Sequence, residues 1–178
     1  MTHEELIALA LQSGADKAAI IRGEDVVLSA SFRDICRSNG CGMYGRCWMC
    51  PPDIGEIGEL MARVRAFDHA LLYQTIHGIE DSFDIEGMTG AGAEHALVSQ
   101  RINDAVKLLP EERLHLSCGG CHLCPRCTKM DGKPCRMPGK ALPPMEGYGI
   151  DVYLTTRPTE LKYINGQNTV TYFGIVLF

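Results

Sequence analysis

Three stretches of the chain place their hydrophobic residues at the spacing of an amphipathic helix. The first follows Thr2 and Glu5, whose spacing matches a capping box, and it is expected to end at Gly14. The second begins after Asp53, a residue type that favours the helix N-cap. Its apolar positions are Ile57, Leu60, Met61 and Val64. The third covers residues 93–109. Its apolar face consists of Val98, Ile102, Ala105, Val106 and Leu109. We therefore predict helices in these three stretches.

Other apolar runs have the length and composition of strands. They lie at 18–21, 26–29, 70–76, 113–117 and 169–178. The first two are separated by a turn at 23–25, and the fourth leads into a cysteine-rich loop. Because helices alternate with strands, we expect an α/β or α+β fold in which helices flank a central sheet. The chain has 178 residues, which fit a single domain.

A glycine-rich segment at 87–92, with the sequence Gly-Met-Thr-Gly-Ala-Gly, precedes the third predicted helix. Such a segment could hold a phosphate group at the helix N-terminus. It lacks the glycine spacing of a dinucleotide-binding fold. We therefore favour a flexible loop that leads into the helix.

Composition and charge exclude several classes of protein. The net charge of −5 argues against nucleic acid as the main partner. No apolar run approaches the roughly 20 residues that a membrane helix needs. The first residues show no basic segment before an apolar one, so we expect no signal peptide and a cytoplasmic location, where thiols stay reduced. The cysteines number nine, an odd count that does not suit a purely disulfide-bonded protein.

The cysteines fall into two groups, in loops at about 36–52 and 118–138. The first group is Cys36, Cys41, Cys47 and Cys50. The second group is Cys118, Cys121, Cys124, Cys127 and Cys135. Thiolates three residues apart on an irregular loop can all turn toward one centre, as they do around an iron–sulfur cluster and less often around zinc. Zinc usually takes paired C-x2-C knuckles, which the successive x2 spacings of the second group fit less well.

The second group resembles the ferredoxin pattern, which has three cysteines at x2 spacing and a remote cysteine near a proline. Its three could be Cys121, Cys124 and Cys127, or Cys118, Cys121 and Cys124. The surrounding basic residues are Arg126, Lys129, Lys133, Arg136 and Lys140, against Asp131 alone. This charge would offset that of a cluster, raise its potential or dock an acidic electron donor, or it would simply be a solvated basic loop.

Other side chains are weaker candidates. Trp48 and Tyr44 of the first loop could shield a cluster from water or could be ordinary packing residues. His122, within the second loop, is expected to be a donor to a metal ligand or an exposed residue. The remaining central histidines, which we expect to be structural, are His69, His77, His95 and His115. Glu146 and Asp151 could supply a catalytic carboxylate, although helix caps or surface charges are the favoured interpretation.

The chain resembles a family of small, cysteine-rich predicted metal-binding proteins of unknown function, found mostly in anaerobic bacteria and archaea. The residues that carry the resemblance are Cys36, Cys41-Gly-Met-Tyr44-Gly-Arg-Cys47-Trp48-Met-Cys50-Pro51-Pro52, Cys121-His-Leu-Cys124-Pro-Arg-Cys127, Gly132-Lys-Pro-Cys135-Arg136-Met-Pro138 and Pro144-Met-Glu146-Gly-Tyr-Gly149-Ile150-Asp151-Val152. The resemblance implies iron–sulfur clusters bound by cysteines. It also implies that Cys36, Cys41 and Cys50 are firmer ligands than Cys47, and that Cys118 is additional. If Cys47 does not ligate, one iron is open to a substrate.

Three functions remain. The favoured one is a redox protein with two [4Fe–4S] clusters that exchanges electrons with a partner protein. One cluster would be bound by Cys121, Cys124, Cys127 and Cys135, and the other by Cys36, Cys41, Cys50 and Cys47. The first alternative is an enzyme that uses a cluster with an open iron on a small substrate. The second is a zinc-stabilised scaffold. The sequence contains no G-x-S-x-G, Walker A or H-E-x-x-H motif that would indicate another chemistry.

Overall fold

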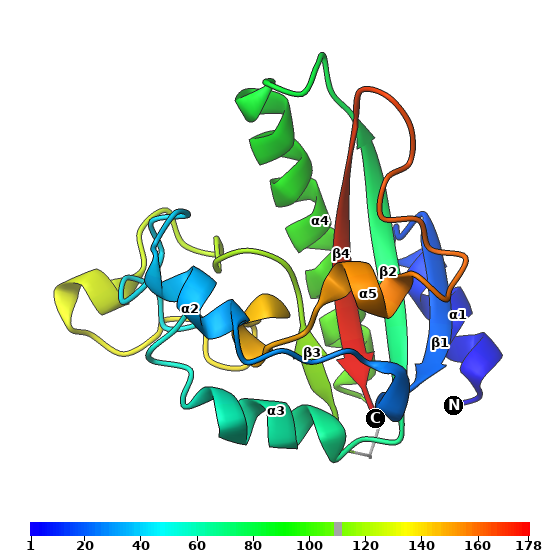
Figure 1. The fold of residues 1–178 in the computed structure, drawn as a ribbon, viewed down its shortest axis with the longest axis horizontal. Coiled ribbons are helices and arrows are strands. Elements are labelled where there is room, and N and C mark those ends of the chain that lie inside the picture. The colour runs from blue at the N-terminus through cyan, green and yellow to red at the C-terminus, as the bar shows by residue number, and fades with distance from the viewer. Residues whose placement is uncertain (109–111) are drawn as a thin grey trace.

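The computed structural model describes residues 1–108 and 112–178. At its centre lies a four-stranded antiparallel sheet with the spatial order β1-β2-β4-β3 (Figure 1). The strands are β1 (Lys17–Arg22), β2 (His69–Gly78), β3 (Leu114–Leu116) and β4 (Thr169–Leu177). The two long central strands, β2 and β4, pair from Ala70 opposite Leu177 to Gly78 opposite Thr169. The expected mixture of helices around a central sheet is confirmed.

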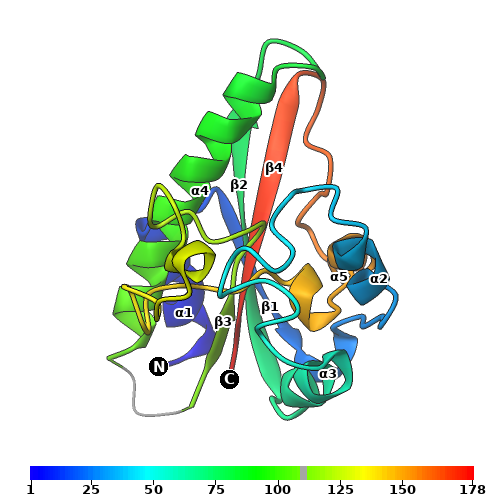
Figure 2. The same cartoon turned by 90° about the vertical axis from the view of Figure 1, so that its left-hand side faces the viewer.

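Helices cover both faces of the sheet (Figure 2). The helices are α1 (His3–Gln12), α2 (Phe32–Arg37), α3 (Ile57–Arg65), α4 (Ile85–Val106) and α5 (Val152–Thr156), with short 3-10 turns η1 (Gly23–Asp25), η2 (Thr128–Asp131) and η3 (Glu146–Tyr148). The helices α1 and α4 lie on one face, and α2, α3 and α5 lie on the other. Each face of the sheet therefore has its own hydrophobic core.

Alternation along the central strands fills the two cores. In β2, Leu71 and Tyr73 face α1 and α4, whereas Leu72 faces the side of α3. All three are at most 1% exposed, and complete burial of an aliphatic side chain of this size contributes about 1.5–3 kcal/mol. Gly174 of β4 makes room for Tyr73, because a Cβ atom at that position would meet the Tyr73 hydroxyl oxygen at 2.1 Å. The sheet region is thus held mainly by closely packed apolar side chains.

Several predicted elements are confirmed. Thr2 and Glu5 form the capping box of α1, with the Glu5 amide donating to Thr2 Oγ1 at 3.2 Å and the Thr2 amide donating to Glu5 Oε2 at 2.7 Å. Gly14 follows that helix in a backbone conformation with φ of 105°. The predicted strands at 18–21, 70–76, 113–117 and 169–178 correspond to β1, β2, β3 and β4.

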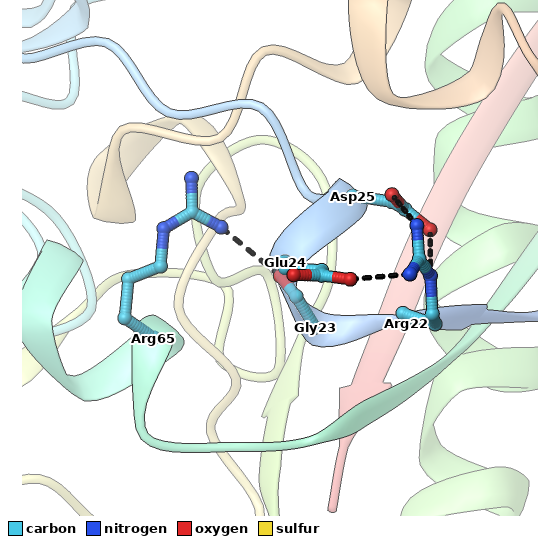
Figure 3. Close-up of polar contacts among 5 residues, drawn as sticks. All are labelled: Arg22, Gly23, Glu24, Asp25 and Arg65. Carbon is cyan, nitrogen blue, oxygen red and sulfur yellow. Dashed lines mark hydrogen bonds and ion pairs between the residues drawn. The ribbon is translucent and has the colours of Figure 1, made fainter.

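The strand predicted at 26–29 is wrong. The turn η1 before it is closed by Arg22, which donates to Asp25 at 2.9 and 3.0 Å and also pairs with Glu24, while Arg65 of α3 donates to the Gly23 carbonyl at 3.0 Å (Figure 3). After this turn the chain pairs with residues 149–151, since the Ser29 amide donates to the Gly149 carbonyl at 2.7 Å and the Asp151 amide to the Val27 carbonyl at 2.9 Å, and β1 pairs with β2 instead. Leu28 forms an isolated bridge with Ile150.

Two predictions about helix starts are also wrong. The helix predicted after Asp53 begins after Glu56, because the Asp53 carboxylate pairs with Lys129 instead of capping the helix. The helix predicted at 93–109 begins at Ile85, where Asp84 caps it by accepting the Gly87 amide at 2.7 Å. Residues 87–92 therefore form the first turns of α4 and are not a loop. The predicted end at Leu109 lies outside the described residues.

The two cysteine-rich loops lie side by side at one end of the molecule (Figures 1 and 2). The second loop leaves the end of β3, as expected, whereas the first lies between α2 and α3 and is not attached to a strand. Cys36 belongs to the last turn of α2. Within the described residues, no helix is both long enough and apolar enough to span a membrane.

Candidate metal centre

The second cysteine loop is a closed excursion from the sheet. Just after β3, the Ser117 amide donates to the Pro143 carbonyl at 2.9 Å, and the Met145 amide donates to the Ser117 carbonyl at 2.8 Å. The second loop therefore leaves the sheet and returns to it at the same point, beside Ser117. The sheet fixes both ends of the loop, while the loop's own contacts position its thiols.

A buried arginine fixes the first loop. Arg33 of α2 is 4% exposed and donates to the Gly55 carbonyl at 2.9 Å and to the Gly147 carbonyl at 3.4 Å. Gly55 follows the first loop, and Gly147 lies in η3, against which α2 packs. The sequence analysis missed this residue, because neither carbonyl is near Arg33 in the chain.

A contact between Trp48, Asp53 and Lys129, which we call the inter-loop contact, joins the two loops. The indole nitrogen of Trp48 donates to the Lys133 carbonyl at 2.9 Å, and the Lys129 ammonium lies 4.4 Å from the centre of the Trp48 ring. The same ammonium forms an ion pair with Asp53, and the two side chains are 25% and 14% exposed. Asp53 is thus bound to the other loop, and Lys129 is not merely a solvated charge.

Four cysteines of the second loop line one small cavity. Cys121, Cys124, Cys127 and Cys135 all line it, together with Thr128, Met137 and neighbouring residues. The Met137 amide points at the Cys135 sulfur from 3.4 Å, the kind of hydrogen bond that tunes metal-bound sulfur. These are the four residues that the sequence analysis assigned to one cluster, and the fold brings them together.

Cys47 lies where the two loops meet. It is fully buried, and its sulfur interacts with the thiols of Cys50 and Cys127 and with the Cys121 amide. The hydrogen bond with Cys50 is the largest cause that lowers the pKa of Cys47, against the opposing effect of burial. The same hydrogen bond and burial raise the pKa of Cys50. Cys47 therefore favours the thiolate, which is the form that binds metals.

The other thiols of the first group are close to one another. Burial is the main cause that raises the pKa of Cys36, and the charge of Cys41 adds to it. Both Cys36 and Cys41 also raise the pKa of Cys50. In addition, a Cβ atom on Gly120 of the second loop would lie 3.6 Å from the Cys50 sulfur, so the second loop covers this group.

Cys118 has different surroundings from the other thiols of its loop. Burial and the charge of Glu146 raise its pKa to about 12, so that it is a neutral thiol at neutral pH. Burial also raises the pKa of Glu146, whose charge in turn acts on Cys36. Glu146 therefore lies near thiols of both groups, whereas Asp151 accepts the Leu154 amide at 2.9 Å and is the N-cap of α5.

A chain of buried polar side chains behind Cys118 was not expected from the sequence. Ser117 lies 3.0 Å from Ser99, whose hydroxyl lies 2.8 Å from that of Tyr73, and Tyr73 lies 2.8 Å from Nε2 of His115. Burial lowers the pKa of His115 to about 3, so that its ring is neutral. The four residues come from β2, α4 and the β3 region, so no spacing in the sequence could have revealed them.

The remaining histidines occupy varied positions. His95 is buried, contacts Thr75 at 2.8 Å and has its pKa lowered to about 4, chiefly by burial. His77 lies 3.2 Å from Glu94 of α4, and His69 stacks on Phe178. His122 is exposed and lines an open cleft of about 610 Å³ between the two loops.

The donor set of these loops consists of thiols, which as soft ligands suit iron–sulfur clusters, zinc and copper(I). All nine cysteines are free, four of them in the first group and five in the second, and such a set fits a metal centre held by sulfur. Among the described residues, no three or more His, Cys, Asp and Glu side chains are arranged to hold a single metal ion.

A comparison with protein families shows to which family the chain belongs. A family model described as predicted metal-binding protein (DUF2284) matches residues 19–178. The chain belongs to this family. The match includes both cysteine loops, and it supports metal binding by this protein. Neither the curated proteins nor the solved structures compared with the chain contain a match.

Proposed function

We propose that this protein binds two [4Fe–4S] clusters and transfers electrons to a partner protein. Cys121, Cys124, Cys127 and Cys135 would hold one cluster, and Cys36, Cys41, Cys50 and Cys47 would hold the other. The observation that carries this proposal is the single cavity lined by the four thiols of the second loop. When bound, such clusters supply one-electron chemistry.

The residues between the two groups support an exchange of electrons. Cys47 of the first loop lies close enough to Cys127 of the second loop for that thiol to help lower its pKa, so the two thiol groups adjoin. Trp48 follows Cys47 and is hydrogen-bonded to the second loop. The inter-loop contact therefore holds both groups in one unit, which suits a carrier that passes electrons from one centre to the other.

The charge near the thiols supports an acidic redox partner. The basic residues of the two loops and their flanks are Arg37, Arg46, Arg126, Lys129, Lys133, Arg136 and Lys140. The acidic residues of the same regions are Asp131 in the second loop and Asp34 and Asp53 at the flanks of the first, so basic residues remain in excess. Because the whole chain has a net charge of −5, the rest of the molecule is correspondingly acidic. An acidic partner would be oriented toward the cysteine end by this asymmetry.

The test is a redox titration of anaerobically purified protein followed by electron paramagnetic resonance. We expect one-electron reduction of two centres, with spectra that show magnetic coupling between them. The proposal is wrong if the protein that carries its metal shows no redox-active signal between the potentials of about −700 and +450 mV that such clusters span.

A second candidate function, an enzyme with an open metal position, is favoured by one observation. The cleft of about 610 Å³ reaches Cys41, Cys121, Cys124 and Cys127, so a small molecule could approach the thiols directly. Addition of cyanide distinguishes the two functions. A changed resonance signal supports an open metal position, and an unchanged signal supports a carrier whose centres have complete ligand sets.

A further inference from the structure

The cleft between the two cysteine loops has a basic lining. Its charged side chains are Arg46 of the first loop and Arg126 of the second, and His122 adds an imidazole. The lining contributed by the described residues includes no Asp or Glu. At about 610 Å³, the cleft lies within the range of about 300–1,000 Å³ that is typical of ligand sites.

The two arginines are held in ways that leave them able to bind a ligand. Arg46 donates through Nε at 3.4 Å to the sulfur of Met130, which also lines the cleft, and this uncharged acceptor does not neutralise the guanidinium group. Arg126 pairs with Asp131 at 3.0 Å, but the two side chains are 63% and 43% exposed. An exposed ion pair of this kind contributes little stability, so an anion can compete for Arg126.

We infer that this cleft is a binding site for a small oxyanion, a carboxylate or a phosphate group, held between Arg46 and Arg126. The planar guanidinium group presents paired N–H donors that match the oxygens of either group. Because each loop supplies one arginine, the site is complete only when the loops are assembled. Cys41 and Cys124 also line the cleft, so the bound anion would lie against both thiol groups.

This inference goes beyond electron transfer, since a simple carrier needs no ligand pocket. It does not depend on the identity of the metal. The opposing interpretation is that the arginines only offset the negative charge of metal-bound thiolates. The two interpretations differ in one respect: charge compensation is spread over every basic residue of the loops, whereas a binding site depends on the two arginines that line it.

The test is a calorimetric titration of the full-length, anaerobically purified protein with inorganic phosphate and, separately, with malonate. Arg46→Met and Arg126→Gln each remove one guanidinium group. Lys133→Gln is the matched control, because Lys133 is an exposed basic residue of the same loop that does not line the cleft. We expect at least one anion to bind the natural protein, and each arginine variant to weaken that binding about tenfold or more. The control should stay within about twofold of the natural protein.

Two results would overturn the inference. One is that neither anion binds the natural protein, and the other is that Lys133→Gln weakens binding as much as the arginine variants do. Stronger binding of phosphate or of malonate identifies the class of ligand. Thermal unfolding of each variant shows whether the loops are intact, and Arg126→Lys, which keeps the charge, should recover part of the lost affinity if the fold is preserved. Iron and sulfide analysis of the same samples tests the cluster proposal independently of anion binding. A failure of that proposal can therefore be distinguished from a failure of this one.

Discussion

The sheet and the cysteine end of this molecule are held together in different ways. The sheet rests on two apolar cores in which residues such as Leu71, Leu72 and Ile175 are at most 1% exposed. The cysteine end depends on a few specific polar contacts, above all those of Arg33 and the inter-loop contact of Trp48, Asp53 and Lys129. We therefore expect the sheet to stay folded under changes that release the loops, and metal binding to respond to contacts that hardly affect global stability.

The largest effect should come from a change in the sheet. In Gly174→Val, the new side chain would clash with the Tyr73 hydroxyl, since even a Cβ atom would lie 2.1 Å from it. Steric overlap and the loss of the buried hydrogen bonds of Tyr73 should lower the free energy of unfolding by about 4 kcal/mol. Denaturant unfolding followed by circular dichroism measures this. Unchanged stability would contradict the packing described for this face.

The next effect should be confined to the cysteine end. Cys124→Ser removes one thiol from the cavity of the second loop and should reduce the iron content from about eight to about four per chain. Cys118→Ser is the matched control, because Cys118 is a neutral, half-buried thiol that we place outside both ligand sets. It should keep both clusters. Full iron content in Cys124→Ser, or loss of iron in Cys118→Ser, would overturn the ligand assignment.

Acid should lower the stability of the sheet region by protonating its buried histidines. Burial lowers the pKa of His95 to about 4, from about 6.5 in the unfolded chain. The folded state thus favours the neutral ring. The contribution of this preference to the free energy of unfolding is complete above pH 6.5 and is lost as the pH falls toward 4. For His95 this loss is about 3 kcal/mol. Between pH 7 and pH 4, the free energy of unfolding should depend less steeply on pH in His95→Gln than in the natural protein.

The control for this experiment is His122→Gln, since His122 is exposed on the second loop. It should follow the natural protein at every pH. A similar slope in the natural protein and His95→Gln would show that the charge state of His95 does not contribute to acid sensitivity.

The smallest effect on stability should come from the inter-loop contact. Lys129→Met removes the ion pair with Asp53 and the cation that lies over Trp48, and should cost about 1 kcal/mol or less in global stability. It should nevertheless increase hydrogen exchange in both loops and weaken metal retention. Because Trp48 is the only tryptophan, its fluorescence reports the change directly. Lys133→Met, which leaves the Lys133 carbonyl in place, should leave the Trp48 emission unchanged.

The same contrast explains what the sequence could predict. The strands at 70–76 and 169–178 and the helix after Thr2 were predictable because burial and capping leave local patterns in the chain. The strand predicted at 26–29 failed because residues 27–29 pair with residues 149–151, which are distant in sequence, and form only an isolated bridge there. The start of α4 was missed because its glycines suggested a loop, whereas the cap at Asp84 outweighs their low helix propensity.

At the cysteine end, too, some features were predictable from the sequence and others depend on the fold. Spacing within the second loop predicted a shared centre but left open whether Cys118 or Cys127 joins Cys121 and Cys124, whereas in the fold Cys121, Cys124, Cys127 and Cys135 line one cavity. The position of Cys47 between the loops was not predictable, since it depends on how two loops some seventy residues apart pack together. Neither the role of Arg33 nor the buried chain behind Cys118 has a sequence signature, because each joins segments that only the fold brings together.

The most direct test of the central claim is the content of iron and acid-labile sulfide per chain in anaerobically purified protein. Two [4Fe–4S] clusters predict about eight of each. Zinc without sulfide would contradict the claim and would leave a protein whose cysteine loops are held together by structural metal ions.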